Sequence, residues 1–516
     1  MNFLTLTKKL DDFLEMGIPF YDCIVMKDGK CVYRHANGYT DINKKTEVTG
    51  KELYNIYSCS KLITCVAALQ LFEKGLFKLD DELYRYMPEF KNMTVRSDNG
   101  IIPAKNKITI RQLFTMTAGF SYDLNSPMLE KCRRETNGKC PTREAMKYLA
   151  KEPLLFEPGY RWAYSLCHDV LAALVEVLSG MTFGEYVKKN IFDVCGMENS
   201  AFLIDETNKL VNQYKYNPET DKVEECAKDS IYRIGTKYES GGAGCVSTVE
   251  DYIKFLEAIR TYKLLKKETV DLLSTNQLTK EQIEMPTYWV EGKRGFGLGQ
   301  ECPTAENTRP DFGWGGAAGA HYFIDRTNNI TAYFGTHVLG YEEFQQARTS
   351  ITDNVKFASK TIDAAFWLNA TATPTLCYNE IDIFETFGND SAISNIHTWD
   401  NNYKLQGGTD FHYDWSSELG DSRVIAKGIY DGKFHTIGLQ WEENYLKFYF
   451  DGELKLTVSN TESNSERFTA FANALLYTEF LATPKTGFGS WSGLDSSFEI
   501  DYIRYYQNAG SEFGIR

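Results

Sequence analysis

A serine and a lysine three residues apart form the first pair in this chain whose types and spacing suggest covalent catalysis. Ser58 and Lys61 stand at the start of a predicted helix, in which apolar residues recur at three and four positions until Gly75. Both side chains would lie on one helical face, one turn apart. A serine hydroxyl is a weak nucleophile unless a base removes its proton, and a lysine that burial keeps neutral is such a base. The same spacing also suits a capping serine beside a solvated lysine.

Several segments around this pair resemble one enzyme family, in the order in which that family has them. They are Lys27-Asp-Gly-Lys30, Tyr54–Lys61, Ile108–Leu113, Thr117-Ala-Gly119, Trp162-Ala-Tyr-Ser165 and Gly241-Gly-Ala-Gly244. The family is that of serine β-lactamases and penicillin-binding proteins, which includes class C β-lactamases, D-alanyl peptidases and family VIII carboxylesterases. The resemblance covers about residues 8–355. It implies a β-lactamase-like α/β fold with Ser58 as the nucleophile.

The periodicities of this segment favour the same fold class. They predict helices at 109–117, 142–151, 166–179 and 249–262, and strands at 295–300, 313–324 and 329–336. An earlier hairpin turns at Asp28-Gly29, a pair that suits a primed turn. We therefore expect helices packed on an antiparallel sheet whose strands come from both ends of the segment.

The resemblance also implies a partner for the nucleophile. Tyr164 stands where the family has the tyrosine that hydrogen-bonds the serine and shares acid–base duty with the lysine. A phenol is a weak acid, so a neighbouring ammonium is needed for it to exchange protons at neutral pH. Where β-lactamases continue Tyr-x-Asn, this chain has Leu166. The missing asparagine normally helps to hold the amide side chain of a lactam or peptide.

A glycine pair stands where the family has its substrate-binding strand. The usual Lys-Thr-Gly or His-x-Gly is replaced by Trp314-Gly315-Gly316, followed by Ala317. The missing lysine normally pairs with the carboxylate of the antibiotic or peptide. Trp-Gly-Gly resembles the family VIII esterases instead, and glycines let a substrate lie close to the strand backbone. The backbone N–H groups of Ser58 and Ala317 would then form the oxyanion hole.

We predict a serine carboxylesterase that hydrolyses short-chain acyl esters through an acyl-enzyme on Ser58. A β-lactamase or a D-alanyl carboxypeptidase is the first alternative, and a catalytically inactive binding protein that keeps the fold is another. No Gly-x-Ser-x-Gly elbow occurs, which argues against an α/β-hydrolase.

A second candidate site lies in Glu380-Ile-Asp-Ile-Phe-Glu385. On a strand, Glu380 and Asp382 share one face. Glu385 has the wrong parity for that face, and one bulged residue after Asp382 would restore it. Three acids on one face repel each other, which raises the pKa of at least one carboxyl group. A glycosidase needs one protonated carboxyl group as the acid and one ionised carboxylate as the nucleophile, and different pKa values provide this.

The acidic strand and its surroundings resemble glycoside hydrolase family 16, the laminarinase and lichenase type. The resemblance covers about residues 356–508 and includes Ala365-Phe-Trp-Leu368 and Phe434–Trp441. It implies Glu380 as nucleophile, Glu385 as acid–base and Asp382 as the group that tunes them. Because the match begins in the middle of that fold, we expect an all-β partial jelly roll of the concanavalin-like sandwich class. β-Glucanase or glucan-binding activity of this domain is a further alternative.

Composition limits the partners. The chain has 516 residues and a formal net charge of −14, which disfavours nucleic acids and anionic membranes. No segment is apolar over the ~18 residues of a membrane span. The twelve cysteines include no C-x-x-C pair, so we expect no metal site and no cofactor. Cys132 and Cys140 could close a loop, although free buried thiols fit better. The expected partners are a small-molecule ester and, for the second domain, β-glucan.

We expect a cytoplasmic protein, because the first residues form an amphipathic helix and lack the apolar core of a signal peptide. The predicted domains are a β-lactamase-like hydrolase over 1–355 and a partial jelly roll over 356–508. Residues 509–516, which contain Gly-Ser-Glu-Phe, resemble a vector-derived or disordered tail.

Overall fold

The computed structural model describes residues 3–204, 209–285, 294–304 and 311–359, together with strand segments between 363 and 479. Its contacts divide the chain into two compact units. One unit spans Thr7–Asp353, and the other spans Asn354–Arg516 with Met1–Leu6. Each unit is built on sheets of its own.

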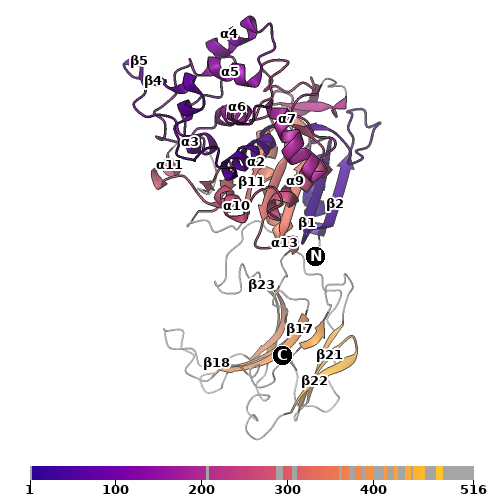
Figure 1. The fold of residues 1–516 in the computed structure, drawn as a ribbon. Helices are drawn as coiled ribbons and strands as arrows, with labels where there is room; N and C mark the ends of the chain where they lie inside the picture. Colours follow the sequence, from indigo (N-terminus) through magenta and orange to yellow (C-terminus); the bar gives the residue numbers. More distant parts are fainter. Residues whose placement is uncertain are drawn as a thin grey trace. The chain divides into compact units, whose positions relative to one another are not determined.

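The larger unit contains a seven-stranded antiparallel sheet in the order β2-β1-β13-β12-β11-β10-β9 (Figure 1). Its strands are β1 (Phe20–Lys27), β2 (Lys30–Gly38), β9 (Gly295–Phe296), β10 (Glu301–Cys302), β11 (Asp311–Gly315), β12 (His321–Asp325) and β13 (Ile330–Gly335). The N-terminal hairpin therefore lies beside strands from the far end of the unit, which confirms the expected arrangement. Asp28 and Gly29 have φ values of 50° and 77°, as a primed turn requires.

The single strand predicted over 313–324 is wrong. β11 ends at Gly315 and β12 begins at His321, with a tight turn between them. In this turn the N–H of Gly316 donates to the carbonyl of Ala320 at 2.7 Å, and Gly319 has a φ of 101°. The turn residues are small and apolar, so the hydrophobic pattern continues through them without a polar interruption.

Two of the helices lie in the core of this unit. Nearly every residue of α2 (Ser60–Glu73) is buried, and it packs against the equally apolar α6 (Cys167–Ser179). A third helix, α9 (Val249–Arg260), packs on β13, β1 and β12 (Figure 1). The other helices are α1 (Leu4–Glu15), α3 (Ile110–Phe114), α4 (Pro127–Glu135), α5 (Thr142–Leu149), α7 (Phe183–Val187), α8 (Asp193–Cys195), α10 (Lys267–Ser274), α11 (Lys280–Glu284), α12 (Glu342–Ala347) and α13 (Ser350–Ser359).

The four predicted helices correspond to α3, α5, α6 and α9, and each is shorter than its sequence pattern. Threonine caps explain two of the beginnings. Thr248 accepts a hydrogen bond from the Asp251 N–H, and Thr109 forms a capping box with Gln112.

The larger unit also contains three short sheets. They pair β3 (Tyr54–Asn55) with β8 (Val246–Ser247), β4 (Thr94–Ser97) with β5 (Gly100–Pro103), and β6 (Gln213–Asn217) with both β14 (Val338–Leu339) and β7 (Lys222–Cys226). The pairing of β3 with β8 brings residues just before Ser58 beside residues just after the Gly241–Gly244 segment. Two motifs that are far apart in sequence are therefore joined by backbone hydrogen bonds.

The smaller unit contains two antiparallel sheets in its described strands. They are β15 (Asp363–Ala370), β16 (Tyr378–Glu385), β17 (Ser391–Trp399), β18 (His412–Asp414), β19 (Val424–Lys427) and β23 (Ala472–Glu479) in one, and β20 (Ile437–Glu442), β21 (Tyr445–Phe450) and β22 (Glu453–Ser459) in the other. The strands predicted near 364–369, 379–386, 435–441 and 445–451 are confirmed. The strand predicted over 498–507 and the tail at 509–516 lie outside the described residues, and the jelly roll remains a prediction.

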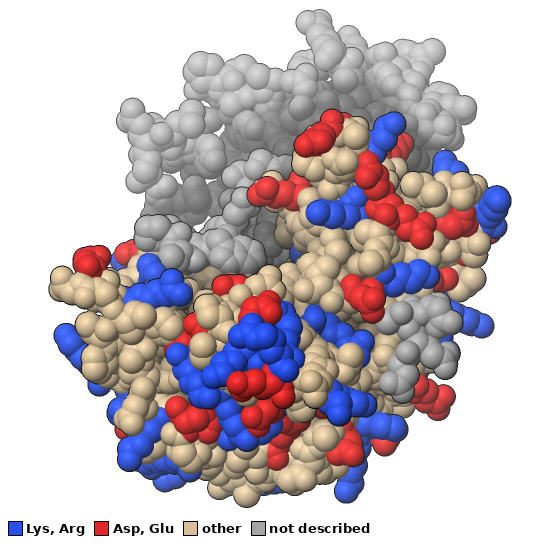
Figure 2. Space-filling model, turned by 90° about the horizontal axis from the view of Figure 1, so that it is seen from above, with Lys and Arg blue, Asp and Glu red and all other residues tan. Residues whose placement is uncertain are grey.

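The described surface carries charges of both signs. Figure 2 shows basic and acidic side chains interspersed on the face seen from above. On α4 and α5 they pair within one helix, as Lys131 does with Glu135 at 3.7 Å and Lys147 with Glu144 at 2.6 Å. In the described part of the chain, no single helix is long and apolar enough to cross a bilayer; the bent pair Cys167–Ser179 and Phe183–Cys195 meets that test only when taken together. Cys132 and Cys140 are both buried and free.

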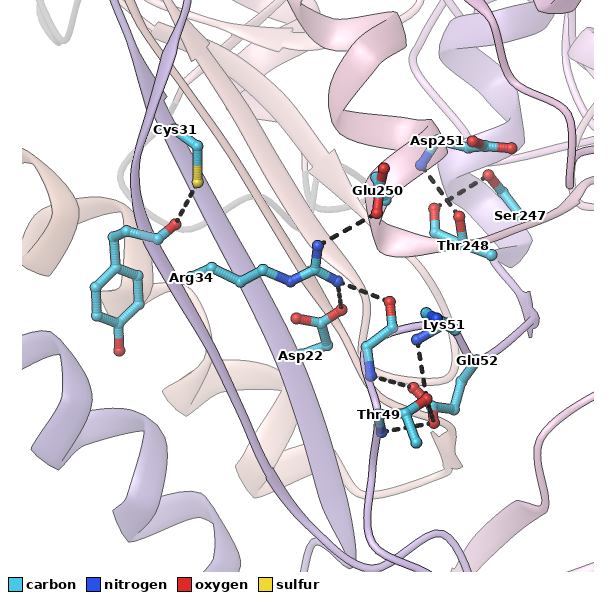
Figure 3. Close-up of polar contacts among 12 residues, drawn as sticks. Asp22, Cys31, Arg34, Thr49, Lys51, Glu52, Ser247, Thr248, Glu250 and Asp251 are labelled. Atoms are coloured by element: carbon cyan, nitrogen blue, oxygen red, sulfur yellow. Dashed lines mark hydrogen bonds and ion pairs between the residues drawn. The ribbon is translucent and has the colours of Figure 1, made fainter.

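Arg34 pairs with a buried aspartate inside the first hairpin and also connects the hairpin to neighbouring segments of the larger unit (Figure 3). Arg34 on β2 donates to Asp22 Oδ2 on β1 at 3.1 Å and to the carbonyl of Gly50 at 2.7 Å. It also reaches Glu250, at the start of α9, at 3.4 Å. Burial raises the pKa of Asp22 to about 6, although the Arg34 guanidinium lowers it. The ionised carboxylate is therefore held at a cost that one guanidinium does not fully offset.

Asp22→Asn tests this balance, because it removes the ionisable group and keeps an oxygen for Arg34. The pKa of Asp22 in the folded chain, about 6, lies above its ordinary value of 3.8, so the folded state loses stability as pH rises through this window. We expect the free energy of unfolding of the wild type to fall relative to that of D22N between about pH 4 and about pH 7. Urea denaturation at both pH values measures this change.

Glu250→Gln is the matched control, because it changes an exposed carboxylate on the same arginine. It should keep most of the pH dependence of the wild type, because Glu250 is only a minor cause of the raised pKa of Asp22. A constant stability difference between wild type and D22N across the window would contradict the prediction.

Candidate active site

Ser58 lies in a single 3-10 turn, Tyr57–Cys59, directly before α2. The turn begins with an unusual backbone: Tyr57 has a φ of 47°, the left-handed region that bulky residues avoid. The Tyr57 hydroxyl donates to Gln213 Oε1 at 2.5 Å, and this bond helps to hold the turn. Strain of this kind persists where the surroundings enforce it, and it concentrates at functional sites. The Ser58 side chain is only slightly exposed, at 7%.

Lys61 lies one helical turn after Ser58 and is 1% exposed. Its Nζ donates to the carbonyl of Gly242 at 2.7 Å and lies 3.4 Å from both Ser58 Oγ and Tyr122 Oη. The lysine is therefore buried and aimed at the serine, and the solvated alternative for this residue is wrong. Its strongest contact is with a backbone carbonyl, which leaves the ammonium close to the serine without an ion pair to a carboxylate among the described residues.

Tyr164 approaches the same serine from the loop before α6. Its hydroxyl donates to Ser58 Oγ at 2.5 Å, and its ring lies 4.4 Å from Lys61 Nζ. The loop is anchored at both sides, since Ala163 N–H donates to Met116 at 3.0 Å and Leu166 N–H donates to Ser121 at 3.1 Å. The structure thus brings both Lys61 and Tyr164 within hydrogen-bonding distance of Ser58 Oγ.

Trp314 and the two glycines occupy the end of β11 beside this group. The Trp314 ring stacks against Tyr164, with centroids 5.9 Å apart and planes at 25°, and is only 7% exposed. Gly316 packs against the backbone just before Ser58: a Cβ added there would lie 2.6 Å from the Ile56 carbonyl oxygen. Only glycine allows the strand to end so close to the serine turn.

The turn after β11 is held by side chains from the segment around α12. Arg348 Nη1 donates to the carbonyls of Gly316 and Ala320 at 2.7 and 2.6 Å, and Gln345 Nε2 donates to the carbonyl of Ala317 at 2.8 Å. Within the described residues, neither the Ser58 N–H nor the Ala317 N–H donates a hydrogen bond. Two amide N–H donors are therefore available beside the serine, and Gln345 holds the carbonyl of one of these residues, Ala317.

Sequence reasoning missed two neighbours of this group. Tyr122 stacks on Tyr164, with centroids 5.2 Å apart and planes at 3°, and it also contacts Lys61. Tyr122 lies three residues after the Thr117-Ala-Gly119 segment, and this spacing does not indicate that it stacks on Tyr164. Asp169 is the second missed neighbour, and it is fully buried. The only sign of it in the sequence is that it is an acidic residue in an otherwise apolar helix.

The second set of predicted site residues lies on β16. In the pairing of β16 with β17 the register shifts between Asp382 and Glu385, where the sequence predicted a bulge. Glu380 lies opposite His397, and Asp382 opposite Asn395. The side chains of these three acids lie outside what the structure describes, so their roles remain predictions.

Two family models match this chain. The beta-lactamase family model matches residues 8–355, and the glycosyl hydrolases family 16 model matches residues 336–504. The chain is 28% identical to Esterase EstB of Burkholderia gladioli over 344 residues, which are 61% of this chain and 84% of that protein. It is 29% identical to the lovastatin esterase of Penicillium rubens over 343 residues, or 60% of this chain and 86% of that one.

Two solved structures share the fold of the larger unit. One is EstCE1, described as a hydrolase with promiscuous acyltransferase activity, with a TM-score of 0.57 and 23% identity over 68% of this chain and 98% of its own. The other is unliganded simvastatin synthase from Aspergillus terreus, with a TM-score of 0.56 and 22% identity over 69% and 97%. With a family match over most of its length and esterases among its relatives, the chain belongs to the β-lactamase family and is a serine hydrolase.

Proposed function

We propose that this chain is a carboxylesterase that hydrolyses short-chain acyl esters through an acyl-enzyme on Ser58. The observation that carries the proposal is the 2.5 Å hydrogen bond from Tyr164 to Ser58 Oγ, with the buried Lys61 Nζ 3.4 Å from the same oxygen. A nucleophile within hydrogen-bonding distance of two proton-transfer groups is the arrangement that covalent acyl transfer requires.

Acylation begins when Ser58 Oγ forms a bond to the ester carbonyl carbon and its proton passes to Tyr164 or Lys61. The carbonyl electron pair moves onto oxygen, where the N–H groups of Ser58 and Ala317 stabilise the negative charge. The tetrahedral intermediate then collapses, and the alcohol leaves with the proton that the serine lost. In the second half, water attacks the acyl-serine, gives up its proton by the same route, and releases the carboxylic acid.

The residues beside the nucleophile favour an ester over a lactam. Trp314 stands at the position of a substrate-binding lysine and packs on Tyr164, so it supplies no cation for an antibiotic carboxylate. Leu166 is buried and offers no side-chain amide. The named esterases among the relatives support the same substrate class.

A second function is proposed for the C-terminal segment on separate grounds. The family 16 match and the register shift beside Asp382 favour β-glucan hydrolysis or binding there, by a partial jelly roll. Glu380 and Glu385 would act as nucleophile and acid–base.

Ser58→Ala and Tyr164→Phe test the esterase proposal with p-nitrophenyl butyrate. S58A should lower turnover by about 10³-fold or more, because the acyl-enzyme cannot form. Y164F should lower kcat/KM by about 10²- to 10⁴-fold, the usual contribution of general acid–base catalysis. Tyr160→Phe is the matched control, since this tyrosine in the same loop is 60% exposed; it should behave as the wild type.

The alternatives give different results in the same assays. Undiminished ester turnover by S58A would sink the proposal. Nitrocefin turnover as fast as ester turnover would favour the β-lactamase alternative. Fluorophosphonate labelling of Ser58, located by mass spectrometry, excludes an inactive binding protein.

Gly316→Ala tests the close approach of β11 to the serine turn. The added methyl group would lie 2.6 Å from the Ile56 carbonyl oxygen, so the turn that carries Ala317 must move away. We expect kcat to fall by about 10²-fold or more, the effect of losing one oxyanion donor, while the protein stays folded by circular dichroism. Gly438→Ala is the control, because a Cβ there meets Tyr449 at an ordinary 3.6 Å. If G316A keeps the wild-type kcat, the close approach of Gly316 to Ile56 is not needed for catalysis.

Glu380→Gln tests the glucan proposal. If the C-terminal segment is a glucanase, release of reducing sugar from laminarin or lichenan by the full chain should disappear in E380Q and persist in S58A. If the full chain migrates more slowly in a gel that contains glucan but releases no sugar, the C-terminal segment binds glucan without hydrolysing it. Neither hydrolysis nor retardation in the wild type would contradict both forms of the proposal.

A further inference from the structure

An arginine behind the turn that follows β11 contacts the peptide unit that contains the proposed oxyanion donor. In a peptide unit, the carbonyl of one residue and the N–H of the next lie in one plane. The Gly316 carbonyl and the Ala317 N–H belong to the same unit, and Arg348 Nη1 donates to that carbonyl at 2.7 Å. A hydrogen bond to the carbonyl therefore also fixes the direction of the Ala317 N–H.

The same arginine closes the turn. Its Nη1 also donates to the Ala320 carbonyl at 2.6 Å, and that carbonyl accepts the Gly316 N–H at 2.7 Å. The Gly319 N–H donates to the Gly316 carbonyl at 3.1 Å. A rotation of the Gly316–Ala317 peptide would break the hydrogen bonds of its carbonyl to Arg348 and to Gly319, so the arginine holds this peptide in one orientation.

Two different neighbours explain the glycine pair before this turn. A Cβ added to Gly315 would collide with Arg348 Nη2, whereas one added to Gly316 would meet the Ile56 carbonyl oxygen. Glycine has no Cβ and allows both close approaches. The first glycine therefore makes room for the guanidinium, and the second makes room for the serine turn.

Arg348 carries a charge that no carboxylate offsets within the described residues. Burial lowers the pKa of its guanidinium to about 10, and the groups that act against this shift are Cys59, Tyr164 and Tyr333. The guanidinium therefore stays protonated near neutral pH. Its Nε is enclosed and has no hydrogen-bond partner in the part of the chain that the structure describes. An enclosed cation without a counter-ion is costly, and such exceptions concentrate at functional sites.

We propose that Arg348 is a positioning residue for the ester reaction: it holds the Gly316–Ala317 peptide so that the Ala317 N–H stabilises the oxyanion. The inference rests on the proposed function, in which this N–H is one of two oxyanion donors. A cation that donates to a carbonyl polarises the amide, so the N–H of the same peptide becomes a stronger donor. Arg348 itself forms no bond to the substrate and exchanges no proton.

Arg348→Met tests this role, because methionine keeps an unbranched stem and removes the charge and both hydrogen bonds. Negative charge develops on the substrate oxygen in the transition state, so the loss should fall on kcat. We expect kcat for p-nitrophenyl butyrate, per serine labelled by a fluorophosphonate, to fall by about 10²-fold while KM stays nearly unchanged. Inhibition by phenylboronic acid, which forms a tetrahedral adduct on the serine, should weaken by a similar factor.

Arg326→Met is the matched control. Arg326 directly follows β12 in the same sheet, and its guanidinium contacts Asp271 and Ser274 on α10. R326M should keep the wild-type kcat per labelled serine and the wild-type inhibition by phenylboronic acid. If R348M lowers the melting temperature or the number of labelled serines but keeps the kcat of each labelled serine, Arg348 is only structural and the inference is overturned.

Arg348→Lys covers the case in which R348M does not fold. Lysine keeps the positive charge but lacks the planar guanidinium. We therefore expect kcat and the affinity for phenylboronic acid to fall together, by less than about 10²-fold. Wild-type values of both in R348K would overturn the inference, as would a fall in kcat without a matching loss of phenylboronic acid affinity.

The rate of fluorophosphonate labelling separates this inference from the proposed function, because the phosphoryl oxygen would occupy the same oxyanion site. Slower labelling of R348M, without ester turnover in the wild type, would contradict the esterase and support the role of Arg348. Ester turnover in the wild type with an unchanged kcat in R348M would do the reverse. Absence of labelling in the wild type would overturn both.

Discussion

The burial of the Lys61 ammonium is the constraint on which the rest of the larger unit depends. An ammonium that is 1% exposed needs hydrogen-bond acceptors from the protein, and it finds the Gly242 carbonyl at 2.7 Å with Ser58 and Tyr122 at 3.4 Å. Tyr122 and Gly242 come from segments that are far from Lys61 in the chain, so the lysine can be satisfied only when those segments are in place.

Close backbone approach is the second requirement. The left-handed turn at Tyr57 and the glycine at 316 place β11 against the residues before Ser58. The N–H groups of Ser58 and Ala317 donate no hydrogen bond within the described residues. Arg348 and Gln345 fix the carbonyls of the same turn. An oxyanion site of this kind depends on donors that are already in position before the substrate arrives, because reorganisation during the reaction would reduce the stabilisation.

Aromatic rings stack beside the nucleophile. Trp314, Tyr164 and Tyr122 form a continuous series of stacked rings beside the nucleophile. Such a wall contributes apolar contact area and fixes the tyrosine hydroxyl without offering a partner to a carboxylate.

Local features of the sequence determined Ser58 and Lys61, because a spacing of three residues on a helix places two side chains together whatever surrounds them. The primed turn at Asp28-Gly29 and the register shift beside Asp382 were likewise predictable, since turn chemistry and strand parity act over a few residues. Tyr164 was found by resemblance alone, and Tyr122 and Asp169 were missed. Tertiary structure decided these positions: Tyr164 is 106 residues from Ser58, and Gly242 is 181 residues from Lys61. Contacts over such separations depend on how core helices and sheet pack, and no periodicity along the chain records that packing.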